Sequence, residues 1–185
     1  MELLDVIRGR RSINQFQSDP VPDSVLEEML QAAVWVPNHH LSEPWHFMVI
    51  RGQSLRQMAD FRKAAVLVKN REKPQAERIA EKARDDLLKA PCAVVAVQTI
   101  DENPYRAEED YASTAMAVYN MTLVANSHQV GTYWHTGPLV YFEPFREWLG
   151  LDPLQRIVAY LRVGYPRLIP QGRRTDGLEL TRWLD

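Results

Sequence analysis

The run AVVAVQTI, residues 93–100, limits the possible folds of this chain more than any other feature of its sequence. It is apolar at consecutive positions and comes shortly after Pro91. A strand that faces water on one side alternates apolar and polar residues, whereas a continuous apolar run is typical of a strand buried on both faces. The sequence therefore predicts a sheet that is covered on both sides.

Apolar periodicity and turn residues predict the remaining elements. Further strands are predicted at 45–51 (WHFMVIR), 132–136 (TYWHT) and 156–164 (RIVAYLRVG). Helices are predicted at 2–8, from 23 or 24 to before Pro37, from 54 through the sixties, and at 74–89, 106–128 and 143–149. The pairs Ser24 with Glu27 and Ser54 with Gln57 have the spacing of capping boxes. Glycines at 9, 131 and 150 are expected to end helices.

This order of elements favours an α+β fold that forms one domain over residues 1–185. Two helices separate the first two strands, and the helices differ in length. No predicted strand is followed by GxGxxG, and the sequence has no GxxxxGK[ST], so a doubly wound nucleotide-binding fold is not expected. Any bound phosphate must then be held by side chains.

Composition narrows the classes of partner and compartment. The net charge is -2 and the pI is about 6.2, which argues against nucleic acid as a partner. The single cysteine, Cys92, allows no disulfide within the chain and suits the cytoplasm. Because Cys92 begins the apolar run, a buried structural thiol is favoured over a nucleophile. No export signal is visible, and polar residues interrupt the apolar stretch 112–125, so no membrane span is expected.

The sequence lacks the motifs of hydrolytic and metal chemistry. It contains no GxSxG, no HExxH and no CxxC, and the adjacent His39 and His40 point in different directions in most conformations. We therefore expect no metal site. What remains is chemistry carried by a cofactor, for which the protein supplies anion contacts, a flat apolar pocket and oriented backbone donors.

The segment IRGRRSINQF has two possible interpretations. It places Arg8, Arg10, Arg11 and Ser12 together in a mildly acidic chain. Guanidinium groups beside a hydroxyl suit the binding of a phosphate. Basic residues also complement the negative C-terminus of a helix, so the cluster could be a solvated helix end. The charge pattern alone leaves both interpretations open.

Several segments in order resemble the nitroreductase family of FMN-dependent oxidoreductases. They are RRSINQF, then VPNHHLSEPWHFMVI, KAPCAVVAV and GTYWHTGP. The resemblance implies an α+β fold with a central, mostly antiparallel sheet flanked by helices. It also implies an intertwined homodimer in which the C-terminal tail, residues 165–185, packs on the partner and FMN lies at the interface. The apolar Leu180, Trp183 and Leu184 at the end of the tail fit this expectation.

The same resemblance implies a set of cofactor contacts. Arg10, Arg11 and Ser12 match contacts to the FMN ribityl chain and phosphate, and Arg174, or Arg173, matches a distal phosphate contact. The loop with Trp35, Pro37, Asn38 and His39 matches a segment that reaches the flavin from the partner. Trp134, His135, Thr136 and Gly137 match the segment beside the isoalloxazine ring. Two positions depart from the family pattern: Asn14 replaces a basic residue, and Glu43 replaces the glutamine common before Pro-Trp.

The function implied is transfer of hydride from NAD(P)H through FMN to a small flat acceptor, such as a nitroaromatic or a quinone, in alternating half-reactions. No catalytic side chain is expected, because the flavin carries the chemistry. Three alternatives stay open. The chain could be a flavin-dependent dehydrogenase or oxidase that does not use NAD(P)H, a non-catalytic flavin-binding module, or a structural dimer that has lost the cofactor.

Overall fold

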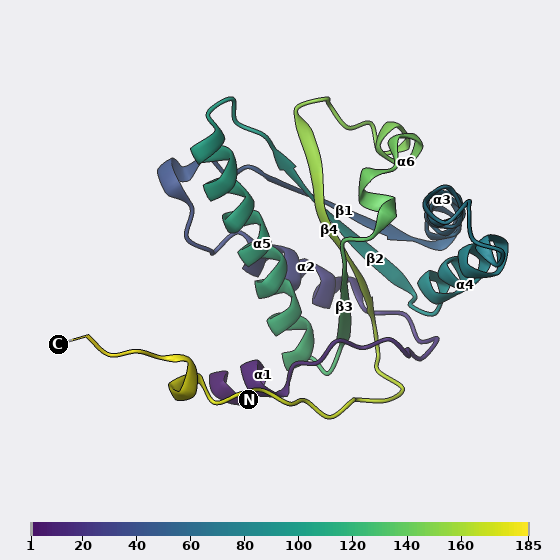
Figure 1. Cartoon of the computed structure of the whole chain (residues 1–185). Coiled ribbons are helices and arrows are strands. Elements are labelled where there is room, and N and C mark those ends of the chain that lie inside the picture. The colour runs from purple at the N-terminus through teal and green to yellow at the C-terminus, as the bar shows by residue number, and fades with distance from the viewer. Residues whose placement is uncertain (1, 185) are drawn as a thin grey trace.

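The centre of the protein is a four-stranded sheet in which every pairing is antiparallel. The computed structural model describes residues 2–184 (Figure 1). The strands are β1 (Trp45–Arg51), β2 (Cys92–Thr99), β3 (Gly131–His135) and β4 (Gln155–Gly164), in the spatial order β1-β2-β4-β3. The predicted α+β fold with an antiparallel sheet is confirmed, and the long apolar run forms the interior strand β2.

The α-helices lie close to where the sequence predicts them. They are α1 (Leu3–Gly9), α2 (Asp23–Ala33), α3 (Gly52–Lys69), α4 (Ala76–Leu88), α5 (Pro104–Ser127) and α6 (Glu143–Trp148). Short 3-10 turns cover His39–Leu41, Pro138–Tyr141 and Gly177–Leu180. Among residues 2–184, no helix combines the length and the apolar character needed to cross a membrane.

The sheet separates two apolar cores. On one face, α2 and α5 pack against side chains of β2 and β4 that include Val94 and Leu161. On the other face, α3 and α6 cover Val95 and Tyr160. Adjacent residues of β2 thus enter different cores, which explains why the strand is apolar at every position up to Gln98. Cys92 is buried, and this burial raises the pKa of its thiol to about 11.

The predicted residues that begin or end helices are wrong at three places, although α2 does begin at the predicted Asp23. Helix α2 begins at Asp23 and α3 at Gly52, and neither helix has a side-chain cap, so the two capping boxes do not form. Gly52, at φ +61°, turns the chain from β1 directly into α3, which places the helix start before Ser54. Helix α5 ends at Ser127, within one residue of the predicted end, but Gly131 does not terminate it, because Gln129 makes the turn at φ 60° and Gly131 already belongs to β3.

The segment that follows α1 runs along the edge of the sheet. Ser12 forms a parallel bridge with Thr132 of β3, and the Ile13 amide donates to the Thr132 carbonyl at 2.9 Å. Further on, the Gln17 amide donates to the carbonyl of Tyr165 at 2.8 Å. The arginine segment therefore lies between β3 and the start of the C-terminal tail. Beyond this point the tail passes α1 and leads away from the rest of the chain (Figure 1).

Candidate functional site

The arginine segment lines a cavity of about 440 Å³. Its walls come from four places that are distant in sequence: the end of α1, the last turns of α5, the first residues of β3, and the start of the tail. A hydrogen bond ties α1 to α5, because the Asn126 side-chain amide donates to the carbonyl of Val6 at 3.0 Å. The same carbonyl accepts the Arg10 amide at 3.1 Å, which fixes the backbone at the entrance of the arginine cluster.

The structure gives the three arginines different surroundings. Arg8 lies exposed in the last turn of α1. The Arg11 Nη1 donates to the carbonyls of Arg8 at 2.6 Å and Arg10 at 2.8 Å, so part of this guanidinium holds the local backbone. The Arg10 Nε is buried and has no hydrogen-bond partner among residues 2–184. Arg10 is thus the member of the cluster that retains an unused buried donor, and Arg8 fits the interpretation of a solvated helix end.

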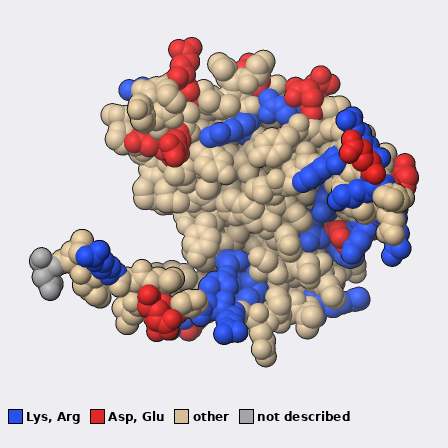
Figure 2. Space-filling view, viewed as in Figure 1, with Lys and Arg blue, Asp and Glu red and all other residues tan. Residues whose placement is uncertain are grey.

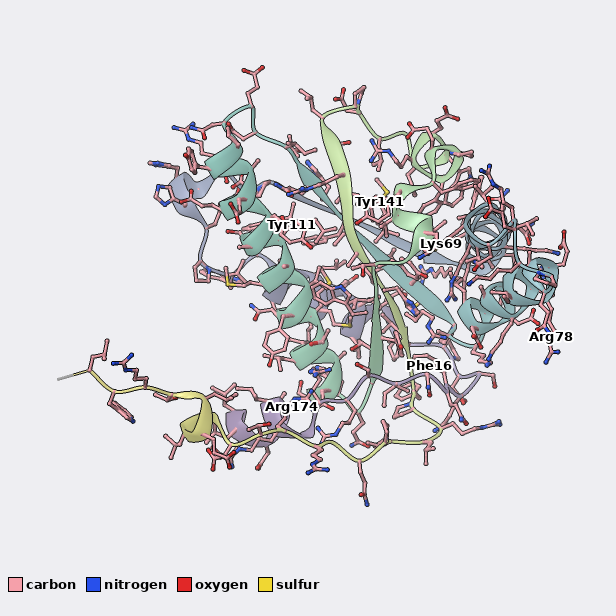
Figure 3. All side chains as sticks on the ribbon, in the orientation of Figure 1. Phe16, Lys69, Arg78, Tyr111, Tyr141 and Arg174 are labelled. Atoms are coloured by element: carbon pink, nitrogen blue, oxygen red, sulfur yellow. The ribbon has the colours of Figure 1, made fainter. Side chains whose placement is uncertain are left out.

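The tail reaches this cavity without bringing Arg174 into it. Tyr165, Pro166 and Ile169 line the cavity, and any Cβ at Gly172 would overlap the Arg11 guanidinium. Arg174 is exposed beside α1 (Figure 3), and its Nη1 donates to the Arg173 carbonyl at 2.7 Å. Ser12 is also exposed and contributes its backbone to the bridge with β3.

Two neighbouring residues of the predicted ring-contact segment lie on opposite faces of the sheet. Trp134 packs on the core formed by α2 and α5. His135 stacks on the other face between Tyr133 and Tyr160, with ring centroids 4.4 and 4.8 Å away. Burial, followed by the nearby positive charge of Arg162, lowers the pKa of His135 to about 3, so its ring is neutral at physiological pH. Thr136 and Gly137 are exposed just beyond the strand.

The predicted partner loop lies at the other end of α5. The Pro37 carbonyl accepts a hydrogen bond from Ser113 at 3.0 Å, and the Asn38 side chain accepts the Glu43 amide at 2.8 Å. Trp35 is 85% exposed, and His39 is exposed with its Nδ1 4.0 Å from a carboxylate oxygen of Glu109.

Within one chain, this loop and the Arg10 cavity do not form a common site. The loop contacts α5 in its first half, whereas the cavity is lined by Thr122 and Asn126 near its end. Ser113 precedes Thr122 and Asn126 by 9 and 13 residues, so a rise of 1.5 Å per residue puts these parts of α5 about 14–20 Å apart.

A second basic cavity, of about 350 Å³, was not anticipated from the sequence. Its cationic side chains are Arg62 of α3, Lys82 of α4, Lys89 just after α4, and Arg162 of β4. His135 and Asn14 also line its wall. In Figure 2, Lys and Arg gather by the arginine segment and, separately, near α3 and α4, with further basic residues in the upper part of the same face. The sequence did contain one signal for this cavity: Arg162 stands inside the apolar strand sequence RIVAYLRVG, where a charged side chain is costly to bury.

Comparison with known proteins agrees with this fold. The profile of the nitroreductase family matches residues 7–165. The chain is similar to "Putative NAD(P)H nitroreductase YfhC" of Bacillus subtilis, at 30% identity over 173 residues, which cover 93% of this chain and 88% of that protein. It is also similar to a solved nitroreductase-like family protein from Bacillus cereus, with a TM-score of 0.87, 32% identity, and coverage of 100% of this chain and 97% of that one.

A third similarity concerns the fold alone. The solved structure of a "putative nitroreductase in complex with fmn" from Desulfovibrio desulfuricans has a TM-score of 0.79 at 24% identity, and covers 100% of this chain and 98% of that one. The profile match extends from the arginine segment through the whole sheet to the start of the tail, and the Bacillus similarities cover nearly all of the chain. The chain therefore belongs to the nitroreductase family.

Proposed function

We propose that this protein is an FMN-dependent oxidoreductase that takes hydride from NAD(P)H and passes it to a small flat acceptor, such as a nitroaromatic or a quinone. Three facts support this proposal beyond membership of the family. The Bacillus subtilis relative is described as an NAD(P)H nitroreductase, the Desulfovibrio desulfuricans structure contains FMN, and the present chain has a basic cavity suited to a phosphate.

The single observation that carries the proposal is the cavity around Arg10. A buried guanidinium nitrogen without a partner is costly, and a phosphate oxygen would satisfy it with a charge-assisted hydrogen bond. Arg11 lines the same cavity, so two permanent positive charges lie in its wall against the one carboxylate of Asp5. The residues present therefore fit the anionic end of FMN. Ser12 and the exposed Arg174 are proposed as further phosphate contacts.

When bound, FMN would supply the redox chemistry, accepting hydride from the nicotinamide and releasing it to the acceptor. The protein's own contribution is to bind and orient. Arg10 and Arg11 would hold the phosphate, and the segment from Trp134 to Gly137 would flank the ring. Because Gly137 is exposed and an added Cβ there would meet no atom within 4 Å, its amide is accessible to a ring atom.

We also propose that the working unit is a homodimer and that Trp35, Pro37, Asn38 and His39 complete the site of the partner. The separation of about 14–20 Å along α5 supports this, since the loop and the Arg10 cavity lie at different ends of that helix within one chain. In an antiparallel pairing of two α5 helices, the first half of one helix would lie beside the second half of the other. Exposed apolar side chains support an interface of this kind; they include Tyr111, Met116 and Tyr119 on α5.

The visible spectrum of the purified protein tests the proposal first. Flavin absorbance should be present, or should appear after FMN is added and excess FMN is removed by desalting. Under anaerobic conditions, NADH or NADPH should then bleach that absorbance, and a nitroaromatic or a quinone should restore it. A protein that stays colourless contradicts the proposal. Bound flavin that neither nucleotide reduces would instead indicate another electron donor or a binding module.

A further inference from the structure

A third cavity, of about 590 Å³, lies beside the first half of β4. Strand β3 pairs with β4 only from Tyr160 onward, so the earlier residues of β4 have no strand on that side within residues 2–184. The walls come from these residues, from α5, and from the chain between Thr136 and Arg146 of α6. Tyr111 of α5 and Tyr141 of the 3-10 turn lie on either side of β4 (Figure 3). A ligand in this cavity would thus meet aromatic side chains from two different elements.

Protein groups fix the guanidinium of Arg156 in the wall of this cavity. Its Nε donates to the Oε1 of Gln98 at 2.7 Å, and its Nη2 lies 3.4 Å from the Ala107 carbonyl. One face of the guanidinium lies over the ring of Tyr111, 4.7 Å from the centroid. Arg156 forms no salt bridge within residues 2–184. These contacts set the plane of the group through Nε and Nη2 and leave Nη1 for a ligand.

The orientation of Arg156 depends on a buried amide. Gln98 is 0% exposed near the end of the apolar strand β2, where a polar side chain is costly unless it is hydrogen-bonded. Its Nε2 donates to the carbonyl of Ala107 at 2.8 Å, which turns its Oε1 toward Arg156. The polar residue that interrupts the apolar run of β2 therefore holds a cation at the cavity.

The charges in the cavity wall suit a single negative charge. Arg146 of α6 is half-buried, and its Nε donates to the Glu143 carboxylate at 3.2 Å, so these two charges balance each other. Arg156 remains as the uncompensated charge of the wall. A guanidinium matches the two oxygens of a carboxylate, whereas a diphosphate would bring more than one negative charge against it. The tyrosine rings suit a flat apolar group attached to that carboxylate.

We propose that Arg156 binds the carboxylate of an aromatic acid in this cavity, and that such acids are the preferred acceptors of the protein. Thr136 supports the second part, because it lines the cavity and also belongs to the segment proposed to flank the flavin ring. Binding of the acid does not depend on FMN. Its role as the acceptor rests on the function proposed above, so the two parts need separate measurements.

Calorimetric titration of the full-length chain with benzoate and with benzamide tests the binding site. The two molecules have nearly the same shape, but only benzoate is charged at neutral pH. Arg156→Gln should weaken benzoate binding by at least ~tenfold and should leave benzamide binding nearly unchanged. Arg78→Gln is the matched control, since it removes the same charge from an exposed position on α4, outside the cavity (Figure 3). It should leave benzoate binding within about twofold, as expected for a distant surface charge.

A second variant keeps the test valid if Arg156→Gln does not fold, because that change leaves the buried oxygen of Gln98 without its partner. Arg146→Gln lies outside this hydrogen-bond network and leaves Glu143 unbalanced in the cavity wall. It should weaken benzoate binding by at least about threefold through the altered charge. Circular dichroism identifies which variants are folded. The site is overturned if the folded cavity variants bind benzoate as tightly as Arg78→Gln does.

Steady-state reduction of 4-nitrobenzoate and 4-nitrobenzamide by the FMN-loaded protein tests the acceptor. In this assay NAD(P)H supplies a hydride and water supplies a proton, and the nitro group becomes a nitroso group with release of water. Arg156→Gln should lower kcat/KM by at least ~tenfold for the acid and by less than about twofold for the amide. Equal losses for both acceptors contradict the proposal. So does a loss confined to the KM of NAD(P)H, which would assign Arg156 to the nucleotide.

The two measurements can fail separately. Benzoate binding that requires Arg156, in a protein that takes up no FMN, would support the site and contradict the proposed oxidoreductase function. Reduction of both nitro compounds at rates that do not depend on Arg156 would support that function and overturn the assignment of aromatic acids as its acceptors.

Discussion

Ile13 lies directly over Gly131. A Cβ added at Gly131 would come within 2.5 Å of the Ile13 Cγ1 and 2.9 Å of its Cβ. This close approach accompanies the hydrogen bond from the Ile13 amide to the Thr132 carbonyl, and both Ile13 and Gly131 line the Arg10 cavity. The placement of the arginine segment therefore depends on the absence of a side chain at one position of β3.

Gly131→Ala should displace the arginine segment from the sheet edge. Overpacking of this kind costs about 1–3 kcal/mol of unfolding free energy, because Ile13 is branched and its backbone is tied to β3. The free energy is measured by urea unfolding, and the affinity for FMN, by fluorescence titration, should fall with it. Gly137→Ala is the control for stability, since an added Cβ there meets no atom within 4 Å. Equal losses of stability in the two variants would contradict this account of the contact.

Arg10→Ala should weaken FMN binding by about 10- to 100-fold, the usual effect of losing a hydrogen bond between charged groups. The matched control is Arg8→Ala, which removes the same charge from an exposed helix end and should change the dissociation constant by less than about threefold. Titration of each apoprotein with FMN, followed by flavin fluorescence, gives both values. Small and equal effects of the two substitutions would contradict phosphate binding by Arg10 and would favour the interpretation of the cluster as a solvated helix end.

His135 should make the protein sensitive to acid. Its pKa in the fold is about 3, against 6.5 for the free side chain, so the unfolded chain binds this proton more strongly. The stabilisation is complete above pH 6.5 and is lost as the pH falls toward 3, by up to about 1.4 kcal/mol per pH unit. His135→Phe keeps an aromatic ring between Tyr133 and Tyr160 but cannot titrate.

Urea unfolding of wild type and His135→Phe at pH 7.5, 6.5, 5.5 and 4.5 isolates this contribution from that of the carboxylates. The difference between the two proteins should be constant above pH 6.5 and should shift in favour of the variant below it. Parallel curves over the whole range would mean that His135 accepts its proton within the native structure.

Much of the fold was predictable because burial on both faces constrains composition strongly. The run in β2 could be apolar throughout only if two cores enclose it, and the structure has a core on each face. The helix ends were less predictable. Ser24 and Ser54 had the correct spacing for caps, but neither side chain caps its helix: α2 begins at Asp23, directly after Pro22, and α3 begins at Gly52, whose φ is +61°. A capping motif does not decide where a helix begins when the preceding strand or turn already fixes the direction of the chain.

The site was predictable only in part, because its components converge through tertiary structure. Arg10 and Arg11 were identified from a local cluster, and they do line a cavity. Successive side chains of a strand point to opposite faces of the sheet, so the prediction of β3 already implied that Trp134 and His135 face opposite ways. The pairing of Arg62 with Arg162 could not be derived, since it requires the packing of α3 on a particular register of β4.

Removal of the apolar side chains at the end of the tail should separate the proposed dimer. Leu180, Trp183 and Leu184 are each 77–79% exposed in the single chain, although they are large and apolar. Burial of such a side chain contributes about 1.5–3 kcal/mol, and a symmetric dimer gains each contribution twice. The triple alanine variant should therefore raise the dimer dissociation constant by at least ~100-fold, as seen by light scattering after size-exclusion chromatography.

The control changes polar residues of the same segment, Glu179→Ala with Arg182→Ala, and should leave the dimer intact. FMN affinity should fall together with dimerisation, because the loop from Trp35 to His39 would then no longer reach the site of the other chain. Loss of FMN in a variant that remains dimeric would place the tail's contribution at the cofactor rather than at the interface. A triple variant that still dimerises at nanomolar concentration and binds FMN normally would contradict an exchanged tail.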